Sequence, residues 1–146
     1  MIEITKNREV AAPVDKVWQL IGDLEHEQKY WTVLKNVQIL KKDTLSVKRE
    51  ATIQRGPIGD AKSVQTLVLD PVRKISTLTM TEGPMLGERK IALTALDNGK
   101  TKISVDWQFE LKGIPGFAQG FVKDNISEVT AKALSSIALE VVSGKS

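Results

Sequence analysis

The sequence predicts an α+β fold in which a curved antiparallel sheet wraps around one long C-terminal helix. Residues Phe117 to Val142 contain no proline, and their apolar side chains recur at steps of three and four, the period of one helical face. Before them come six segments rich in Val, Ile, Thr and Leu, separated by short turns. The helix would be roughly 39 Å long at 1.5 Å per residue, so its apolar stripe needs a surface as extended as a sheet.

The composition is that of a single soluble domain. The 146 residues are 41% hydrophobic and 27% charged, and no apolar run approaches the roughly 18 residues of a membrane span. The N-terminal residues lack the pattern of a signal peptide, so we expect a cytoplasmic protein. The absence of cysteine excludes a disulfide framework, a thiolate zinc site and a cysteine nucleophile. The net charge of +3 is spread over isolated basic pairs, which argues against nucleic-acid binding.

The chain up to Trp31 predicts one strand followed by two short helices. The strand covers Ile2 to Val10 and ends before Pro13. The next segment, Val14 to Ile21, has apolar residues at helical spacing, and a proline just before it suits a helix start. Asp23 is the expected N-cap of the second helix, which closes at Trp31.

Six further strands follow. They are expected at Val37 to Leu40, Leu45 to Ile53, Ser63 to Leu69, Ile75 to Met80, Glu88 to Leu96 and Thr101 to Leu111. The turns between them are Lys42-Asp43-Thr44, Gly56-Pro57-Ile58-Gly59, Asp70-Pro71, Gly83-Pro84 and Asp97-Asn98-Gly99. Short turns between consecutive strands imply an antiparallel meander. In the middle strands both faces carry apolar residues, so the pattern does not decide which face is inner.

The last two strands indicate their own register. A three-residue loop with Gly99 in the left-handed position pairs Leu93 with Ile103, Ile91 with Val105 and Arg89 with Trp107. A two-residue turn would instead place Ile91 and Leu93 on the solvent face, which is less favourable. We therefore expect Arg89 to point to the inner face of the sheet, next to Trp107.

Several short motifs accompany this order of elements. They are Val10-Ala11-Ala12-Pro13-Val14-Asp15-Lys16-Val17-Trp18, Asp23, Trp31, Leu69-Asp70-Pro71-Val72-Arg73-Lys74-Ile75, Glu82-Gly83-Pro84 and Asn98-Gly99-Lys100-Thr101. In this order they resemble the START-like (SRPBCC) superfamily, in its polyketide cyclase/dehydrase-like or coenzyme Q-binding-like branch, over the single domain 1–146. The glycine-rich loop of the pollen-allergen branch is not reproduced, because its nearest equivalent is Gly56-Pro57-Ile58-Gly59.

The resemblance implies a helix-grip fold, with a seven-stranded curved antiparallel sheet around the C-terminal helix in the order β-α-α-β-β-β-β-β-β-α. It also implies a cavity between sheet and helix for a hydrophobic or amphipathic ligand. Members of the superfamily include lipid carriers, hormone sensors, chaperone cofactors and a minority of cyclases and hydrolases. The resemblance therefore constrains the fold more than the function.

The candidate ligand-binding residues lie mainly on the later strands and the N-terminal half of the long helix. They are Arg49, Met85, Arg89, Ile91, Val105, Trp107, Phe109, Phe117, Phe121, Asn125 and Val129. The aromatic residues among them are expected to cluster as a cavity wall, as in other ligand pockets, and core packing accounts for part of the same pattern. Asn125 either orients a ligand carbonyl or hydroxyl, or is simply exposed.

The charged candidates each have a second interpretation. Arg49 either is paired or binds an anion on the inner face, or lies at the sheet edge, and the edge position is favoured. Arg89 either contacts a ligand or makes only a cation–π contact with Trp107. His26, the one histidine, lies among acidic and polar residues and is expected to be solvated.

Two segments that contain glycine and proline suggest a portal for the ligand. They are Pro84-Met85-Leu86-Gly87 and Gly113-Ile114-Pro115-Gly116-Phe117. Trp18 and Trp31 are expected to anchor the short helices rather than to touch a ligand.

The sequence favours a non-enzymatic protein that binds or transports a hydrophobic small molecule, such as a lipid, a polyketide-like compound or a quinone. A cyclase, dehydratase or hydrolase acting in the same cavity is the first alternative, and it would need an inward-facing acid–base group. A protein-interaction module with a filled core is the second. No nucleophile elbow, phosphate loop or dinucleotide motif is present, so no catalytic residue, metal or cofactor is expected. The oligomeric state stays open.

Overall fold

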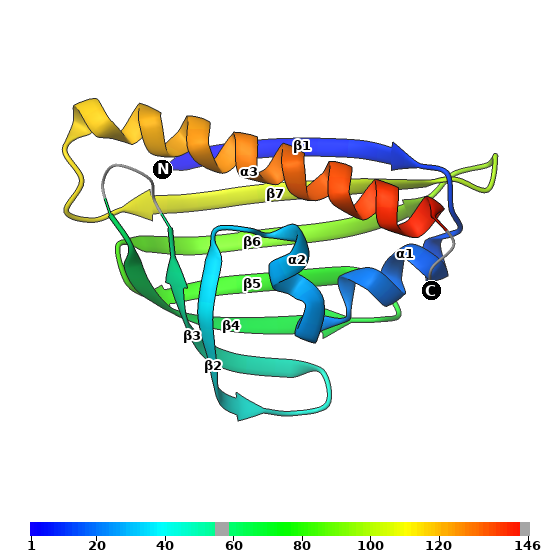
Figure 1. The fold of residues 1–146 in the computed structure, drawn as a ribbon, viewed down its shortest axis with the longest axis horizontal. Coiled ribbons are helices and arrows are strands. Elements are labelled where there is room, and N and C mark those ends of the chain that lie inside the picture. Colours follow the sequence, from blue (N-terminus) through cyan, green and yellow to red (C-terminus); the bar gives the residue numbers. More distant parts are fainter. Residues whose placement is uncertain (55–58, 144–146) are drawn as a thin grey trace.

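The computed structural model describes residues 1–54 and 59–143 and has, within them, the order of elements that the sequence predicts (Figure 1). The elements are β1 Ile2–Val10, α1 Val14–Ile21, the 3₁₀ turn η1 Leu24–His26, α2 Glu27–Tyr30, β2 Leu34–Lys42, β3 Ser46–Ile53, β4 Ala61–Asp70, β5 Ile75–Glu82, β6 Met85–Ala95, β7 Thr101–Leu111 and α3 Gly116–Val142. Of the predicted turn Gly56-Pro57-Ile58-Gly59, the first three residues lie outside the described part of the chain.

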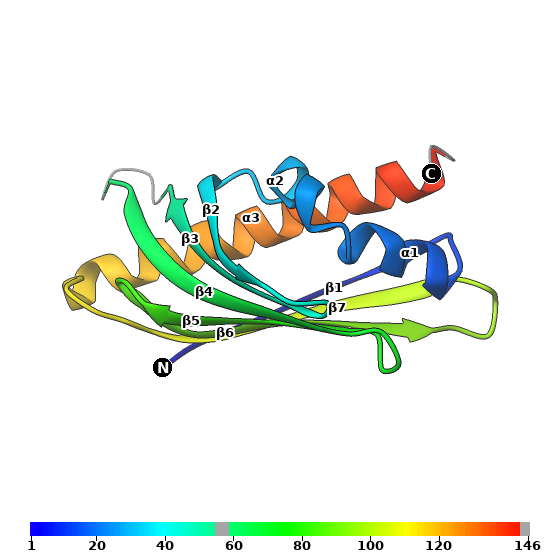
Figure 2. The same cartoon turned by 90° about the horizontal axis from the view of Figure 1, so that it is seen from below.

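One antiparallel sheet holds the seven described strands, in the order β1-β7-β6-β5-β4-β3-β2. Figure 2 shows the strands curving toward α3, which lies along the concave face of the sheet. The short helices α1 and α2 lie on the same face and contact α3 (Figure 1). This is the predicted helix-grip fold, and it encloses the side chains of the inner sheet face between sheet and helices.

The β6–β7 hairpin has the predicted register. Leu93 pairs with Ile103, Ile91 with Val105 and Arg89 with Trp107. The loop is closed by the Leu96 N–H, which donates to the Lys100 carbonyl at 2.8 Å, and Gly99 has a left-handed φ of 77°. Arg89 and Trp107 are both buried, as expected for neighbours on the inner face.

The inner face of the middle strands carries a mixture of polar and apolar side chains. The buried positions are Val47, Arg49 and Ala51 on β3, Ser63, Gln65 and Leu67 on β4, and Ser76, Leu78 and Met80 on β5. The outer face keeps exposed apolar residues such as Val68, which is why the sequence pattern is ambiguous here. Three of the inner polar residues can stay buried because they hydrogen-bond to one another, and they are Arg49, Gln65 and Ser63.

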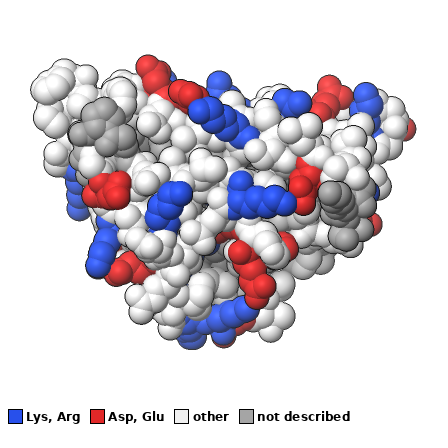
Figure 3. Space-filling view, viewed as in Figure 1, with Lys and Arg blue, Asp and Glu red and all other residues white. Residues whose placement is uncertain are grey.

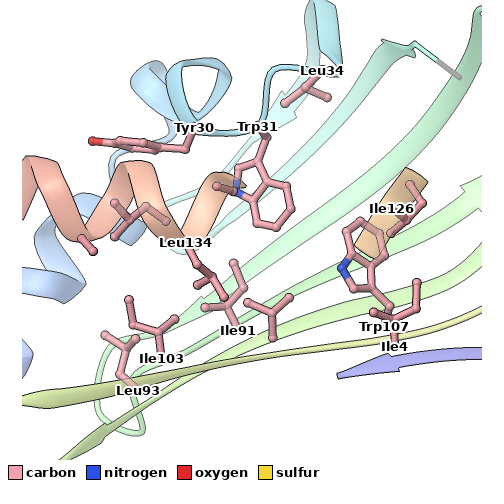
Figure 4. Close-up of a cluster of buried hydrophobic side chains, with 14 of the residues drawn as sticks. Ile4, Tyr30, Trp31, Leu34, Ile91, Leu93, Ile103, Trp107, Ile126 and Leu134 are labelled. Atoms are coloured by element: carbon pink, nitrogen blue, oxygen red, sulfur yellow. The ribbon is translucent and has the colours of Figure 1, made fainter. Parts of the chain in front are cut away.

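Helix α3 packs through one stripe and leaves its first turns exposed. The buried residues are Val122, Ile126, Thr130, Ala133, Leu134, Ile137, Ala138 and Val141, and Figure 4 shows Leu134 and Ile126 within the core that they form. No residue from 116 to 121 is buried, and Phe117 and Phe121 are 92% and 46% exposed. The predicted clustering of these two with Trp107 and Phe109 is therefore wrong. Phe121 lies one position, or about 100° of helical rotation, from the stripe that begins at Val122.

The second short helix begins differently from the prediction. Asp23 occupies the predicted N-cap position, but its side chain makes no capping hydrogen bond, and its carboxylate lies 2.7 Å from Nδ1 of His26. The segment starts as the 3₁₀ turn η1 and continues as the four-residue helix α2. His26 is exposed, as expected, whereas the neighbouring Glu27 is buried.

Gly87 on β6 has no room for a side chain beside β7. It has a φ of 151° opposite Phe109, and a Cβ added there would lie 2.0 Å from the Gln108 carbonyl oxygen. Gly99 also has a positive φ but has open space around it. We expect Gly87→Ala to lower the free energy of unfolding by at least about 3 kcal/mol, and Gly99→Ala by about 1 kcal/mol. Urea unfolding measures both losses, and equal losses would contradict the close approach at Gly87.

Candidate functional site

Three ionisable side chains meet in the interior, each from a different element. Glu27 comes from α2, Arg49 from β3 and Arg89 from β6, and their exposed fractions are 7%, 2% and 4%. Arg49 donates two hydrogen bonds to the Glu27 carboxylate, from Nη1 to Oε1 and from Nη2 to Oε2, the latter at 3.2 Å. Arg89 Nη2 donates to the same Oε2 at 3.3 Å. One carboxylate thus serves two guanidiniums, and this group of three, the Glu27–Arg cluster, carries one net positive charge.

The two arginines differ in how completely their guanidinium nitrogens are hydrogen-bonded. Arg49 Nε donates to Gln65 Oε1 at 2.9 Å, and Gln65 Nε2 in turn donates to Ser63 Oγ at 3.3 Å. Every nitrogen of the Arg49 guanidinium therefore has a partner, and the sheet-edge interpretation of this residue is wrong. Arg89 makes one hydrogen bond among the described residues, and its buried Nε has no partner there.

The charges of the cluster stabilise one another in their ionised forms. Burial alone raises the pKa of the Glu27 carboxyl, but the attraction of Arg89 and the hydrogen bonds from Arg49 outweigh it, so this pKa lies below its ordinary value. Burial lowers the pKa of Arg89, and the attraction of Glu27 opposes that change. Because the ordinary pKa of arginine is far above neutrality, Arg89 stays charged at neutral pH.

Two tryptophans lie against Arg89. Its Cζ is 4.5 Å from the ring centroid of Trp31 and 5.8 Å from that of Trp107, which are cation–π distances. The two rings meet edge to face, with their centroids 6.0 Å apart. Trp107 Nε1 donates to Thr130 Oγ1 of α3 at 3.0 Å, and Figure 4 shows the indole beside Ile126 of the same helix. The orientation of Trp107 is thus fixed by the helix that covers it.

An apolar cavity of about 40 Å³ adjoins the Glu27–Arg cluster. Its polar lining comes from Arg49, Gln65 and Arg89, and most of its remaining wall is formed by tryptophan, methionine, leucine and isoleucine side chains. A second cavity of about 10 Å³ shares Trp31 and Arg89 with it. A cavity needs roughly 10–15 Å³ of such space to hold one water molecule, so the larger cavity has room for a small polar group.

The larger hollows lie on the surface. A groove of about 350 Å³ is lined by residues of α1, η1, α2 and α3, including Lys16, His26 and Glu140. Another of about 490 Å³ lies between η1 and the β2–β3 hairpin. Acidic and basic side chains are interspersed on the face seen in Figure 3. Neither groove brings together side chains of one chemistry, so we place the candidate site in the interior.

The structure divides the predicted site residues into three groups. Those that border the larger cavity are Arg49, Met85, Arg89 and Trp107, and Ile91 borders the smaller one. Those that are buried in the core without lining either cavity are Val105 and Phe109. Those that lie on α3 away from both cavities are the exposed Phe117 and Phe121 and the half-buried Asn125 and Val129. Five of the seven predicted strand residues therefore border a cavity and none of the four predicted helix residues does, and a role of these residues in ligand binding stays a prediction.

Sequence reasoning missed Glu27, Gln65 and the role of Trp31. Trp31 does more than anchor a short helix, because it lines both cavities and contacts Arg89. Glu27 has polar neighbours in the chain, but it lies four residues before Trp31 and so shares a helical face with it. An inward-facing arginine needs a carboxylate as its partner. That need, together with the four-residue spacing from Trp31, is the signal in the sequence that could have revealed the inward position of Glu27.

The two segments expected to form a portal are neighbours. The Lys112 N–H donates to the Pro84 carbonyl at 2.8 Å, and Met85 pairs with Leu111.

Within residues 1–54 and 59–143, no three or more His, Cys, Asp or Glu side chains are grouped to hold a metal ion. Among the same residues, none of the helices combines the length and the apolar character of a membrane span.

Comparison with known proteins identifies a family that the sequence matches and solved structures that share the fold. The model of a family described as "Polyketide cyclase / dehydrase and lipid transport" matches residues 1–141. No curated protein matches the sequence. The protein TTHA0849 from Thermus thermophilus is similar in structure, with a TM-score of 0.85, 17% identity, and coverage of 99% of this chain and 100% of that one.

Two further solved structures share the fold. The Zhui aromatase/cyclase from Streptomyces sp. R1128 has a TM-score of 0.83 and 15% identity, covering 96% of this chain and 93% of its own. A START superfamily protein from Mycobacterium smegmatis has a TM-score of 0.76 and 18% identity, with coverage of 95% and 98%. At these identities the likeness is one of fold.

Proposed function

The chain belongs to the polyketide cyclase/dehydrase and lipid transport family, and we propose that it binds a hydrophobic small molecule between the sheet and α3. The observation that carries the proposal is the apolar cavity beside Trp31, Trp107 and Arg89. Ligand pockets combine mostly apolar and aromatic walls with a few polar groups, and this cavity has that composition. Lipids, polyketide-like compounds and quinones are the candidate classes of ligand.

Binding requires the interior to open further. Ligand pockets usually hold roughly 300 Å³ or more, whereas the larger cavity holds about 40 Å³. In this proposal the start of α3 moves, because residues 116–121 bury no side chain and follow Gly113, whose φ is 71°. Met80 and Met85 line the cavity, and their flexible side chains can repack around a ligand. The neighbouring segments around Pro84 and Gly113 would then form the portal.

A cyclase or dehydratase acting in the same cavity is the second candidate. Two buried guanidiniums can stabilise a developing oxyanion, which is the observation in its favour. However, Glu27 is held ionised with both oxygens bonded, and the Tyr30 hydroxyl points away from the tryptophans (Figure 4). The described lining of the larger cavity contains no His, Asp, Glu, Tyr or Lys to move a proton. Binding without catalysis is therefore better supported.

The neutral fluorescent probe N-phenyl-1-naphthylamine tests the proposed function. We expect the wild-type protein to enhance its fluorescence saturably, and Trp107→Ala to bind it about tenfold more weakly, because an aromatic wall of the cavity is lost. His26→Ala changes an exposed side chain and should bind like the wild type. Circular dichroism establishes that both variants are folded. Equal effects of the two substitutions would count against the cavity, and absence of saturable binding would favour an interaction module with a filled core.

A further inference from the structure

We propose that the ligand is an amphipathic molecule with a single carboxylate, and that Arg89 binds this carboxylate. The inference rests on the proposed function, because it names the class of ligand that the same cavity takes. Three observations meet at one place: a buried cluster with one surplus positive charge, an arginine nitrogen without a partner among the described residues, and an apolar cavity beside it.

The charges of the interior leave one guanidinium without a counter-charge of its own. Among the described residues, Glu27 is the one acidic side chain that pairs with either arginine. Arg49 takes both carboxylate oxygens, and such bidentate pairs are the strong form of this interaction. Because buried charges need partners, Arg89 is the side chain that a further anion would complete. A singly charged head group balances the cluster, whereas a phosphate ester with two charges would overcompensate it.

The bonding of Arg89 leaves donors for that head group. Only Nη2 reaches Glu27, while Nε is buried and has no partner among the described residues. A guanidinium presents its N–H groups as a planar fork that matches the two oxygens of a carboxylate. The rings of Trp31 and Trp107 offset part of the charge through cation–π contacts. Those contacts leave the N–H of Nε without an acceptor among the described residues, which is costly for a buried group.

The lining of the cavity indicates the chemistry of the part of the ligand beyond its carboxylate. Its volume of about 40 Å³ accommodates one small polar group next to Arg89. The walls beyond Arg89 include Leu78, Met80, Met85 and Ile126, which offer an apolar surface and no hydrogen bonds from their side chains. A small inorganic anion would leave these walls without an apolar partner. A carboxylate attached to an apolar body satisfies the charge and the walls together.

Competition with bound N-phenyl-1-naphthylamine at neutral pH tests this inference with decanoate, 1-decanol and acetate. For the wild-type protein we expect the dissociation constant of decanoate to be at least about tenfold lower than that of 1-decanol, and acetate to bind too weakly to compete. Arg89→Met should reduce the ratio to about one, mainly by weakening the binding of decanoate, and Arg89→Lys should retain part of the preference. Lys90→Met, an exposed neighbour on the outer face, removes the same charge and should leave the ratio unchanged.

The outcomes separate this inference from the proposed function. Equal affinities of decanoate and 1-decanol in the wild type, or a preference that survives Arg89→Met, would overturn the inference alone. Acetate competing as well as decanoate would show a site for simple anions and would also overturn it. If neither the fluorescent probe nor either decyl compound binds, the proposed function fails and the inference fails with it. The comparison within the wild type keeps the test decisive if Arg89→Met does not fold.

Discussion

Replacing Glu27 with glutamine is expected to lower the free energy of unfolding by about 3–5 kcal/mol. The substitution keeps the size of the side chain and removes the one carboxylate that Arg49 and Arg89 share. Both guanidiniums would then be buried without a counter-charge, and their attraction to Glu27 would become mutual repulsion. Urea unfolding followed by tryptophan fluorescence measures the loss.

Glu25→Gln is the matched control. It removes the same charge two residues earlier, from an exposed position, and should change the free energy of unfolding by less than about 0.5 kcal/mol. Equal small losses in the two variants would contradict a central role for the Glu27–Arg cluster.

The dependence of stability on pH separates lost charge from lost packing. The folded-state pKa of Glu27 lies below its ordinary value of 4.5, so the unfolded chain takes up this proton first as the pH falls. The stabilisation that ionised Glu27 provides is complete at pH values above its ordinary pKa and is lost as the pH falls through its folded-state pKa. The difference in unfolding free energy between wild type and Glu27→Gln should therefore shrink on acidification below about 4.5. A difference that is independent of pH would indicate a packing defect instead.

Phe109→Ala is expected to destabilise the protein by about 3–5 kcal/mol, whereas Phe117→Ala should change its stability by less than about 0.5 kcal/mol. Phe109 is fully buried, and its ring meets Trp107 edge to face with 6.1 Å between centroids. Phe117 lies in the first turn of α3 and is almost fully exposed. The two sites carry the same substitution, so urea unfolding compares burial alone. Similar losses would contradict the orientation of the first turns of α3.

Alternation along a strand predicted the fold and the β6–β7 register because one face of β7 is uniformly apolar. Ile103, Val105, Trp107 and Phe109 alternate with polar residues, so a slip of one residue would have exposed all of them. Once that register was settled, the inward position of Arg89 followed from geometry. The same reasoning failed on β3 and β4, where Arg49 and Gln65 occupy inner positions that a simple apolar pattern does not mark.

The Glu27–Arg cluster escaped sequence reasoning because its bonds join distant parts of the chain. Glu27 is 22 residues from Arg49 and 62 from Arg89, so no local period links them. Burial of Glu27 depends on how η1 and α2 pack on the sheet. Its charged neighbours in the sequence, such as Glu25, make the segment resemble an exposed helix face. The exposure of Phe121 shows the converse, because a large aromatic residue one position off a helical stripe does not have to reach the core.

The three tryptophans allow binding of a ligand in the interior beside Arg89 to be detected directly. Trp31 and Trp107 line the larger cavity, whereas Trp18 lies on α1 and does not. In a nitrogen-15-labelled sample, titration with N-phenyl-1-naphthylamine should shift the indole N–H resonances of Trp31 and Trp107 and leave that of Trp18 in place. Trp18→Phe identifies the control resonance. Saturable probe binding that shifts only the Trp18 resonance, or none of the three indole resonances, would show that the probe does not bind beside Arg89.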